Sequence, residues 1–145
     1  MMSRIMKFRC WDKKDKQMYK VGTIDFNHPE KGTVTVCYYT ETGSAVSYAA
    51  KGEDNSNLTQ PNLILMQFTG LKDYKGREIY EGDIVEIKHL KIKGEIIWEF
   101  LSWQIKDGGM LSNFQDMEQW KLEIIGNIYE SPDLLKLKGK ENKEK

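Results

Sequence analysis

The chain has 145 residues, of which 39% are hydrophobic and 11% aromatic, enough for one packed domain or one domain with a smaller appendage. Lysine plus arginine and aspartate plus glutamate both number 22, so the formal net charge is zero. Proteins that neutralise many phosphates usually carry a net positive charge, so this balance argues against such a role but leaves room for a local basic patch. With only three prolines, the composition is that of a folded chain.

No pattern of a targeting or membrane segment is present in the sequence. Residues 1–11 alternate charged and apolar side chains and lack the continuous apolar stretch of a signal peptide. The longest apolar runs, such as residues 63–66, are far shorter than the roughly 20 residues of a membrane span. Cys10 and Cys37 match no C-x-x-C pattern and are typical of small core residues in a reducing compartment. We therefore expect a cytoplasmic protein.

The first part of the chain favours a small antiparallel sheet. Strands are expected at residues 7–11 and 18–26, on either side of a wholly charged segment at residues 12–16. Because such a segment cannot be core, we expect these strands to form a hairpin. Residues 33–39 are rich in Thr, Val and Tyr, which suit a pleated, half-buried surface. We assign residues 1–50 to an N-terminal β-hairpin or sheet region.

The second part favours a series of short strands. Residues 51–62 are mostly polar and are interpreted as a loop or linker. Over residues 63–130, apolar stretches are separated by Gly, Asp and Lys turns. Gly82-Asp83-Ile84-Val85, followed by Lys93-Gly94-Glu95-Ile96-Ile97, is how SH3-like small barrels often open. The strands predicted in this region are residues 63–69, 84–87, 95–98, 101–106 and 123–129.

Two positions favour short helices. The capping-box pattern at residues 112–115 predicts one or two helical turns over residues 113–120. Ser131-Pro132 fits the N-cap and first position of a short helix over residues 131–137, and residues 138–145 are expected to be a disordered tail. The predicted fold class is therefore mostly β: short antiparallel strands, an SH3-like small barrel in the C-terminal half, and one or two very short helices.

Three segments together resemble one protein family. They are residues 7–12 (KFRCWD), 66–85 (MQFTGLKDYKGREIYEGDIV) and 125–130 (IGNIYE). In order and spacing they are similar to the YopX family of phage and prophage proteins, and the resemblance spans residues 7–135. It implies a bacterial or phage cytoplasmic protein with an all-β or mostly β fold. It implies no catalytic residues, because no activity is established for that family.

The residues offer little for catalysis or metal binding. His28 and His89 have no second Cys or His at ligand spacing, so no metal site is expected. Cys10 lies in a predicted strand, where burial would keep it from acting as a nucleophile. Glu81 and Asp83 could lie close together, but a Glu-Gly-Asp turn serves mainly backbone geometry. We therefore expect no enzyme and no cofactor.

Two groups of cations make nucleic-acid binding an alternative function. The first surrounds the predicted N-terminal hairpin turn, where two rings flank the charges and stacking could accompany phosphate contacts. The second lies in the first loop of the predicted barrel. The candidate residues are Arg9, Trp11, Lys13, Lys14, Lys16 and Tyr19 in the first group and Lys88, Lys91 and Lys93 in the second.

Protein–protein interaction is the favoured function. Four Trp and seven Tyr are generous for this length, and exposed aromatic residues favour interfaces. Tyr38, Tyr39, Trp98 and Trp103 are the positions of interest, although we interpret both tryptophans as barrel core. Short edge strands favour self-association. We therefore expect a non-catalytic phage or prophage accessory protein that forms homo-oligomers, contacts an unknown protein partner and does not bind membranes. The alternative is a small nucleic-acid-binding β-barrel module.

Overall fold

The computed structural model describes residues 5–28, 33–50, 63–99, 101–107, 110–113 and 121–136. The chain separates into two compact units, one comprising Met6–Gln67 and the other built on Phe68–Lys145. Each unit is described by itself. The predictions of a loop at residues 51–62, of helical turns over residues 114–120 and of a disordered tail at residues 138–145 lie outside the described residues.

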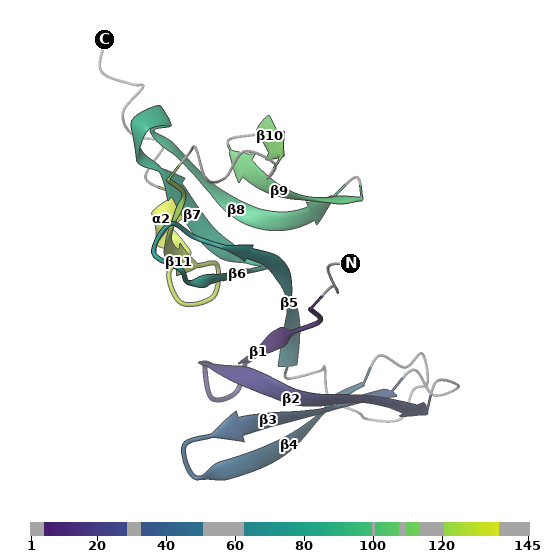
Figure 1. Ribbon diagram of the computed structural model, residues 1–145. Helices are drawn as coiled ribbons and strands as arrows, with labels where there is room; N and C mark the ends of the chain where they lie inside the picture. The colour runs from purple at the N-terminus through teal and green to yellow at the C-terminus, as the bar shows by residue number, and fades with distance from the viewer. Residues whose placement is uncertain are drawn as a thin grey trace. The chain divides into compact units, whose positions relative to one another are not determined.

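The described residues are mostly β, as predicted, and every strand pair is antiparallel. Figure 1 labels the strands along the chain. They are β1 (Phe8–Asp12), β2 (Gln17–His28), β3 (Thr33–Thr40), β4 (Gly43–Ala50), β5 (Leu63–Lys72), β6 (Glu78–Tyr80), β7 (Asp83–Ile87), β8 (Ile92–Glu99), β9 (Ser102–Asp107), β10 (Met110–Asn113) and β11 (Glu123–Asn127). The described helical elements are α2 (Asp133–Lys136) and a 3-10 turn at Lys88–Leu90.

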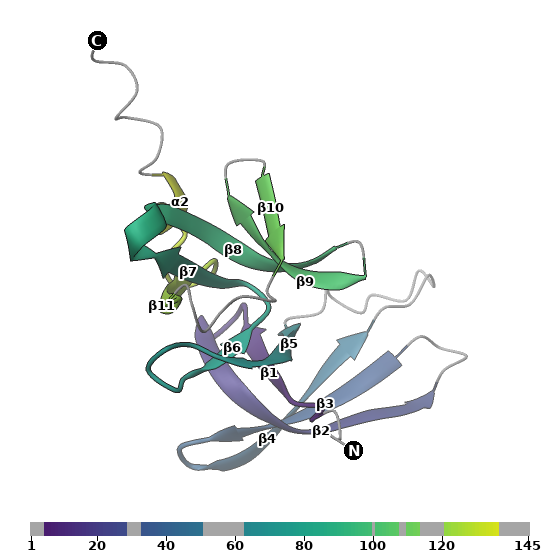
Figure 2. The same ribbon diagram turned by 45° about the horizontal axis from the view of Figure 1, so that its top comes forward.

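The first unit is built on the predicted β1–β2 hairpin. Trp11 is paired with Met18, and the turn closes where the Lys16 N–H donates to the Asp12 carbonyl at 2.8 Å. Lys16 has φ of 54°, in the left-handed region that reverses the chain tightly. Strands β2, β3 and β4 continue as a meander and lie side by side in Figure 2. On its other side, β1 pairs with the first half of β5.

A small core holds this unit together. Cys10 and Val36 are fully buried, Leu63 and Tyr38 nearly so, and Tyr19 packs against them. These residues come from β1, β2, β3 and β5, so the core joins strands that are distant in sequence. Burial, together with the nearby Asp12 carboxylate, raises the pKa of the Cys10 thiol to about 12. Cys10 is therefore a core residue, as its strand position predicted.

The second unit contains the five-stranded sheet β10-β9-β8-β7-β11 and the hairpin formed by the end of β5 with β6. Buried residues alternate with partly buried ones along the middle of β8, whereas β7 buries Ile84 as well as Val85 and Ile87. Gly94 is required at one close approach, because a Cβ there would lie 2.1 Å from the Lys106 carbonyl oxygen. The buried core residues are Ile79, Val85, Ile87, Ile96, Ile105 and Leu122.

The SH3-like small barrel predicted for the C-terminal half is not confirmed, because the described strands form no closed barrel. They form open sheets, and β10 and β11 lie at the two ends of the second unit's strand order. The local prediction of an antiparallel meander after Gly82 is correct, because β7 pairs with β8 and β8 with β9. Closure depends on pairing between the first and last strands, which local turn patterns do not specify. Ser112, the expected helix N-cap, instead lies in β10, where it pairs with Ile105 of β9.

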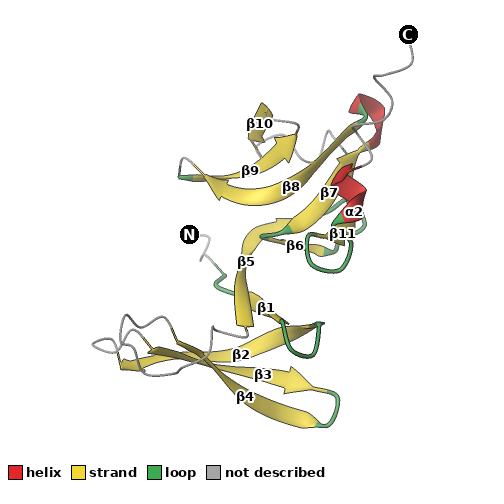
Figure 3. Ribbon diagram, turned by 180° about the vertical axis from the view of Figure 1, so that it is seen from behind, coloured by secondary structure: helices red, strands yellow, loops and turns green. Residues whose placement is uncertain are grey.

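A short helix follows β11, as Ser131-Pro132 predicted. The Leu134 N–H donates to the Ser131 carbonyl at 3.1 Å, and α2 begins at Asp133. Leu134 lies so close to Gly126 that a Cβ on that glycine would be 2.8 Å from the leucine methyl carbon. Figure 3 shows the helical segments in red. The missing side chain at Gly126 therefore allows the helix to pack against β11.

Candidate interaction surfaces

The turn between β5 and β6 is organised by the buried carboxylate of Asp73. Its Oδ1 accepts hydrogen bonds from the backbone N–H groups of Lys75 at 3.0 Å and Arg77 at 2.9 Å. Its Oδ2 accepts from Arg77 Nε at 2.8 Å and from the Ile124 N–H at 3.2 Å. Burial by itself would raise the pKa of Asp73, but these hydrogen bonds and the guanidinium lower it. Asp73 thus joins the β5–β6 turn to β11.

Two further buried polar residues organise turns in the same unit. The Tyr80 N–H donates to Asp83 Oδ2 at 2.8 Å. The side-chain oxygen of Asn127 accepts from the N–H groups of Tyr129 at 3.0 Å and Glu130 at 2.9 Å. Asp83 and Asn127 face each other in the β7–β11 pair. Each therefore organises the turn that adjoins its own strand, before β7 and after β11.

Asp12 has the same role in the first unit. Its Oδ1 accepts from the N–H groups of Lys14 at 2.7 Å and Asp15 at 3.1 Å, and its Oδ2 accepts from the Tyr38 hydroxyl at 3.3 Å. The segments that carry the family resemblance each contain one or more of these Asp or Asn residues. Those polar side chains therefore use their hydrogen-bonding capacity within the fold.

A cluster of cations surrounds Glu123 at the start of β11. Lys75 Nζ donates to Glu123 Oε1, Lys88 Nζ lies 2.8 Å from Oε2, and Arg77 Nη2 lies 3.9 Å from Oε1. The Tyr74 hydroxyl donates to Oε2 at 3.4 Å. The β5–β6 turn is held beside β11 because the Tyr74 N–H donates to the Leu122 carbonyl at 3.0 Å.

The hydrogen bonds from Lys75 and Lys88, with the positive charges of both, lower the pKa of Glu123 to about 2. The same contacts raise the pKa of each lysine. The cluster is therefore fully charged at neutral pH. Its carboxylate is largely buried, with 11% of the side chain exposed, whereas the corresponding exposures of Lys75, Arg77 and Lys88 are 49%, 47% and 67%.

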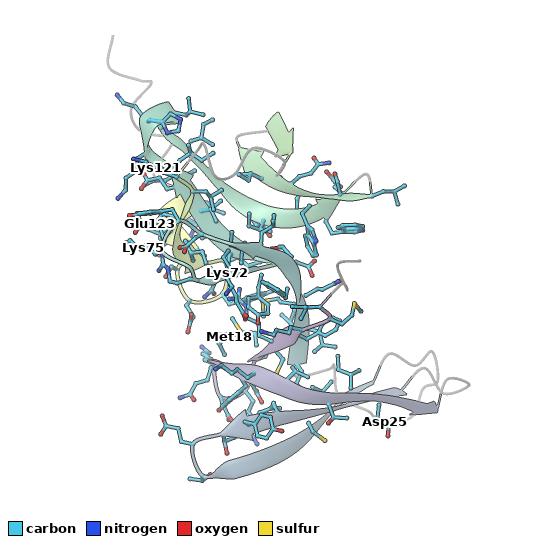
Figure 4. All side chains as sticks on the ribbon, viewed as in Figure 1. Met18, Asp25, Lys72, Lys75, Lys121 and Glu123 are labelled. Atoms are coloured by element: carbon cyan, nitrogen blue, oxygen red, sulfur yellow. The ribbon has the colours of Figure 1, made fainter. Side chains whose placement is uncertain are left out.

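Two more lysines and an exposed ring extend this cluster. Lys72 ends β5 and Lys121 precedes β11, and both are exposed. Figure 4 labels Lys72, Lys75, Lys121 and Glu123 on this unit. The Tyr74 ring is 52% exposed, and Lys75 Nζ lies 5.4 Å from its centroid. We call this set the Tyr74 surface; it comprises Lys72, Tyr74, Lys75, Arg77, Lys88 and Lys121.

Sequence reasoning identified only Lys88 of this surface. The register between β7 and β11, which pairs Glu86 with Glu123, brings the segment after β7 to the start of β11. Lys75 and Glu123 are 48 residues apart in sequence. The one local signal was Glu123 at the start of a predicted strand, two residues after Lys121, and it does not specify which cations approach.

The sequence-predicted residues of the first unit are only partly available for binding. Lys13, Lys14 and Lys16 are exposed in the β1–β2 turn. Trp11 is only 8% exposed, so it is not the exposed stacking ring that the sequence suggested. Tyr19 is half-buried because its ring stacks on Tyr38, with centroids 4.5 Å apart. Arg9, also half-buried, lies in β1 opposite Lys20.

The remaining predicted cations lie around the β7–β8 connection of the second unit. Lys88 contacts Glu123, as described above. Lys93 Nζ lies 3.6 Å from Glu86 Oε1 on the neighbouring strand. Lys91 is exposed at the end of the 3-10 turn, with φ of 54°. Two of the three predicted lysines are thus engaged in ion pairs.

The interpretation of both tryptophans as core is wrong for Trp98. Trp98 and Trp103 pair across the β8–β9 hairpin with ring centroids 5.0 Å apart at 67°. Trp103 packs against the core, but Trp98 is 46% exposed. Both lie near the hairpin turn, beyond most of the buried residues. Leu101 in that turn is 89% exposed and has φ of 62°.

Strand β4 lies at one end of the strand order β4-β3-β2-β1-β5-β6. This strand was not predicted from the sequence. Its pairing with β3 is unbroken, from Thr40 opposite Gly43 to Thr33 opposite Ala50. All eight of its residues are uncharged and none is proline. Among the described strands, β4 pairs with β3 alone, so it presents a long, uncharged edge.

Further features of the described part of the chain bear on its chemistry. No group of three or more His, Cys, Asp or Glu side chains within it is placed to hold a metal ion. None of its helices is both long and apolar enough to cross a membrane.

Comparisons with known proteins agree with the segments identified from the sequence. The family model for YopX protein matches residues 7–136. The structure of protein EF1440 from Enterococcus faecalis is similar with a TM-score of 0.60 and 29% identity, covering 92% of this chain and 99% of that one. The structure of protein yopX from Bacillus subtilis is similar with a TM-score of 0.53 and 20% identity, covering 89% and 97%. No curated protein matches. The chain belongs to the YopX family.

Proposed function

We propose that this chain is a non-catalytic accessory protein of phage or prophage that acts through protein–protein contacts, and that it self-associates by edge-to-edge pairing of β4. The observation that carries the proposal is the uncharged, eight-residue edge that β4 presents. An edge strand exposes a row of backbone N–H and C=O groups that can pair with another strand. Proteins that avoid such pairing place charges, proline or bulges on their edges, and β4 has no charge, no proline and no break in its register with β3.

A second copy of this chain is the partner that β4 suits best. In a two-fold symmetric antiparallel pair, the same strand lies on both sides of the interface, so a charge near the two-fold axis would face its own copy. In a chain with 30% charged residues, the uncharged β4 avoids this repulsion. The other edge strands are shorter: β6 has three residues, β10 four and β11 five.

The buried carboxylates support a role without catalysis. A general base must accept a proton from a substrate. Asp12 and Asp73 already accept hydrogen bonds with both oxygens, mostly from backbone N–H groups. The Cys10 thiol, with a pKa raised to about 12, is protonated at neutral pH and is a poor nucleophile.

The proposal is tested by measuring the mass of the full chain in solution with light scattering over a dilution series. We expect a dimer of about twice 16.9 kDa or a higher multiple. Ser44→Lys and Ser47→Lys place a positive charge on opposite faces of β4. At least one of the two is expected to shift the mass to that of the monomer, because the one nearer the two-fold axis would place its charge close to that of its own copy.

Thr42→Lys is the matched control, since it adds the same charge in the exposed turn before β4. Its mass should equal that of the parent chain. Circular dichroism and thermal melting establish that each variant is folded. A monomeric parent chain, or folded Ser44→Lys and Ser47→Lys variants that both remain oligomeric, would overturn self-association through β4.

A further inference from the structure

We propose that the Tyr74 surface binds single-stranded nucleic acid, with Tyr74 stacking on an unpaired base and the surrounding cations contacting phosphates. This inference goes beyond self-association through β4 and rests on residues of the other unit. It also differs from the surface that the sequence suggested, since of those candidates only Lys88 belongs to it.

The carboxylates beneath the Tyr74 surface are buried, whereas its cations are exposed. The carboxylates of Asp73 and Glu123 are 0% and 11% exposed, whereas the cations that neutralise them are about half or more exposed. Lys72 and Lys121 are exposed and form no ion pair with any other described residue. An approaching ligand therefore meets cationic groups before it meets carboxylates, although the whole chain is formally neutral.

The charge remains positive when the neighbouring strands are included. Glu86 pairs with Lys93, and its side chain is 23% exposed. Glu78 lies opposite Lys72 in the β5–β6 pair and accepts a hydrogen bond from the Tyr80 hydroxyl at 2.9 Å. Counting Asp73, Glu78, Glu86 and Glu123 against six cations leaves a formal charge of +2. The six cations are Lys72, Lys75, Arg77, Lys88, Lys93 and Lys121.

The exposed Tyr74 ring favours single-stranded nucleic acid over other anionic ligands. Tyr74 keeps 52% of its surface exposed while its hydroxyl is held by Glu123, so the ring is both oriented and open. A ring among cations is the arrangement by which proteins bind single strands, because bases stack on the ring and phosphates pair with the cations. The bases of a duplex are already stacked and offer no free face. An acidic peptide would use the charges but would gain little from the ring.

The test uses fluorescence anisotropy of the full chain with a labelled single-stranded pyrimidine oligonucleotide and with its duplex at low salt. The single strand should bind more tightly than the duplex, and its affinity should fall as salt increases. Tyr74→Leu should weaken single-strand binding by about 5- to 150-fold, the range for loss of one stacked base. Tyr74→Phe removes only the hydroxyl and should bind within about twofold of the parent chain, since it keeps the stacking ring.

Paired charge variants localise the binding. Lys72→Gln with Lys121→Gln removes two cations from the Tyr74 surface and should reduce the slope of log affinity against log salt by about 1.4, or about 0.7 per lost phosphate contact. Lys13→Gln with Lys14→Gln removes the same charge from an exposed turn of the first unit and should leave affinity unchanged. Melting curves and solution mass are measured for every variant, so loss of folding or of self-association is recognised separately.

Several outcomes would overturn the inference. One is the absence of binding at low salt. Another is equal binding of duplex and single strand, because stacking on the exposed ring requires an unpaired base. A third is equal weakening by the two double variants, because binding would then not depend on the cations of the Tyr74 surface. If Tyr74→Leu binds like the parent chain and polyglutamate displaces the oligonucleotide, the surface recognises acidic protein instead.

Discussion

Asp12, Asp73 and Asn127 each lie at or just after the end of a strand and accept hydrogen bonds from backbone N–H groups of the turn that follows. A short carboxylate or amide can satisfy turn donors that no strand partner reaches. The residues that make the sequence recognisable are therefore those that build its turns. This is a structural reason for a distinctive motif, and it requires no ligand.

We predict that the substitution Asp73→Asn destabilises the folded chain. The substitution keeps the shape but replaces one acceptor oxygen with an NH₂ group, leaving donors of Arg77 or Ile124 unpaired. We expect the free energy of unfolding to fall by about 2–3 kcal/mol, since a buried, charge-assisted hydrogen-bond network is disrupted. Urea denaturation measures this loss. Asp15→Asn, in an exposed turn, should change stability by no more than about 0.5 kcal/mol; equal effects would contradict the role given to Asp73.

At the scale of elements, the β8–β9 hairpin departs from usual turn chemistry. Glu99 pairs with Ser102, and Leu101 lies in the tight loop just before Ser102. Such loops favour Asn-Gly or Gly-containing pairs, because positive φ values are required. Leu101 has φ of 62° with 89% of its surface exposed, so its side chain contributes little to the core. The hairpin forms because Trp98, Trp103 and the flanking strand pairs stabilise it.

We therefore predict that Leu101→Gly stabilises the protein. Glycine adopts positive φ without the steric cost of a Cβ, which is about 1–2 kcal/mol, and loses part of that gain through its greater unfolded-state entropy. The expected net gain is about 0.5–1 kcal/mol in the free energy of unfolding. Thermal and urea denaturation measure it. Leu101→Ala is the control and should give no gain, because alanine retains the Cβ that is strained at this φ.

At the scale of the whole molecule, equal numbers of acidic and basic residues conceal an uneven distribution of charge. Beneath the Tyr74 surface, the carboxylates of Asp73 and Glu123 are buried because each is paired with donors. The long cationic side chains that pair with them keep their charged ends in water. A net charge of zero is therefore a poor guide to what this surface attracts.

The same arrangement predicts how stability depends on pH. The pKa of Glu123 is about 2 in the folded chain, below its ordinary value of 4.5, so the folded state binds fewer protons between these values. Its stabilising contribution is complete above pH 4.5 and is lost as the pH falls toward 2. Urea denaturation of the parent chain and Glu123→Gln across this range measures it. The stability difference between them should be constant above the upper value and should shrink below it; a difference independent of pH would contradict the charged cluster.

Local features of the sequence determined much of the secondary structure. The charged turn after Asp12, the apolar stretches of β7–β9 and the Ser131-Pro132 helix start were predicted because each depends on neighbouring residues. Strand β4 was missed because Ser, Ala and Gly give little apolar alternation. Pairing with β3 is what makes it a strand.

Because apolar patterning and turn chemistry act over a few residues, the β-rich class, the family and the positions of the main turns could be predicted from the amino-acid sequence. The open sheets, the exposure of Trp98 and the contacts of Glu123 with Lys75 and Lys88 became evident only in the folded chain. These properties depend on strand order and register between distant segments, such as those of Lys75 and Glu123, which are 48 residues apart in sequence. Such pairings are selected by burial and packing of the whole unit, which no local pattern encodes.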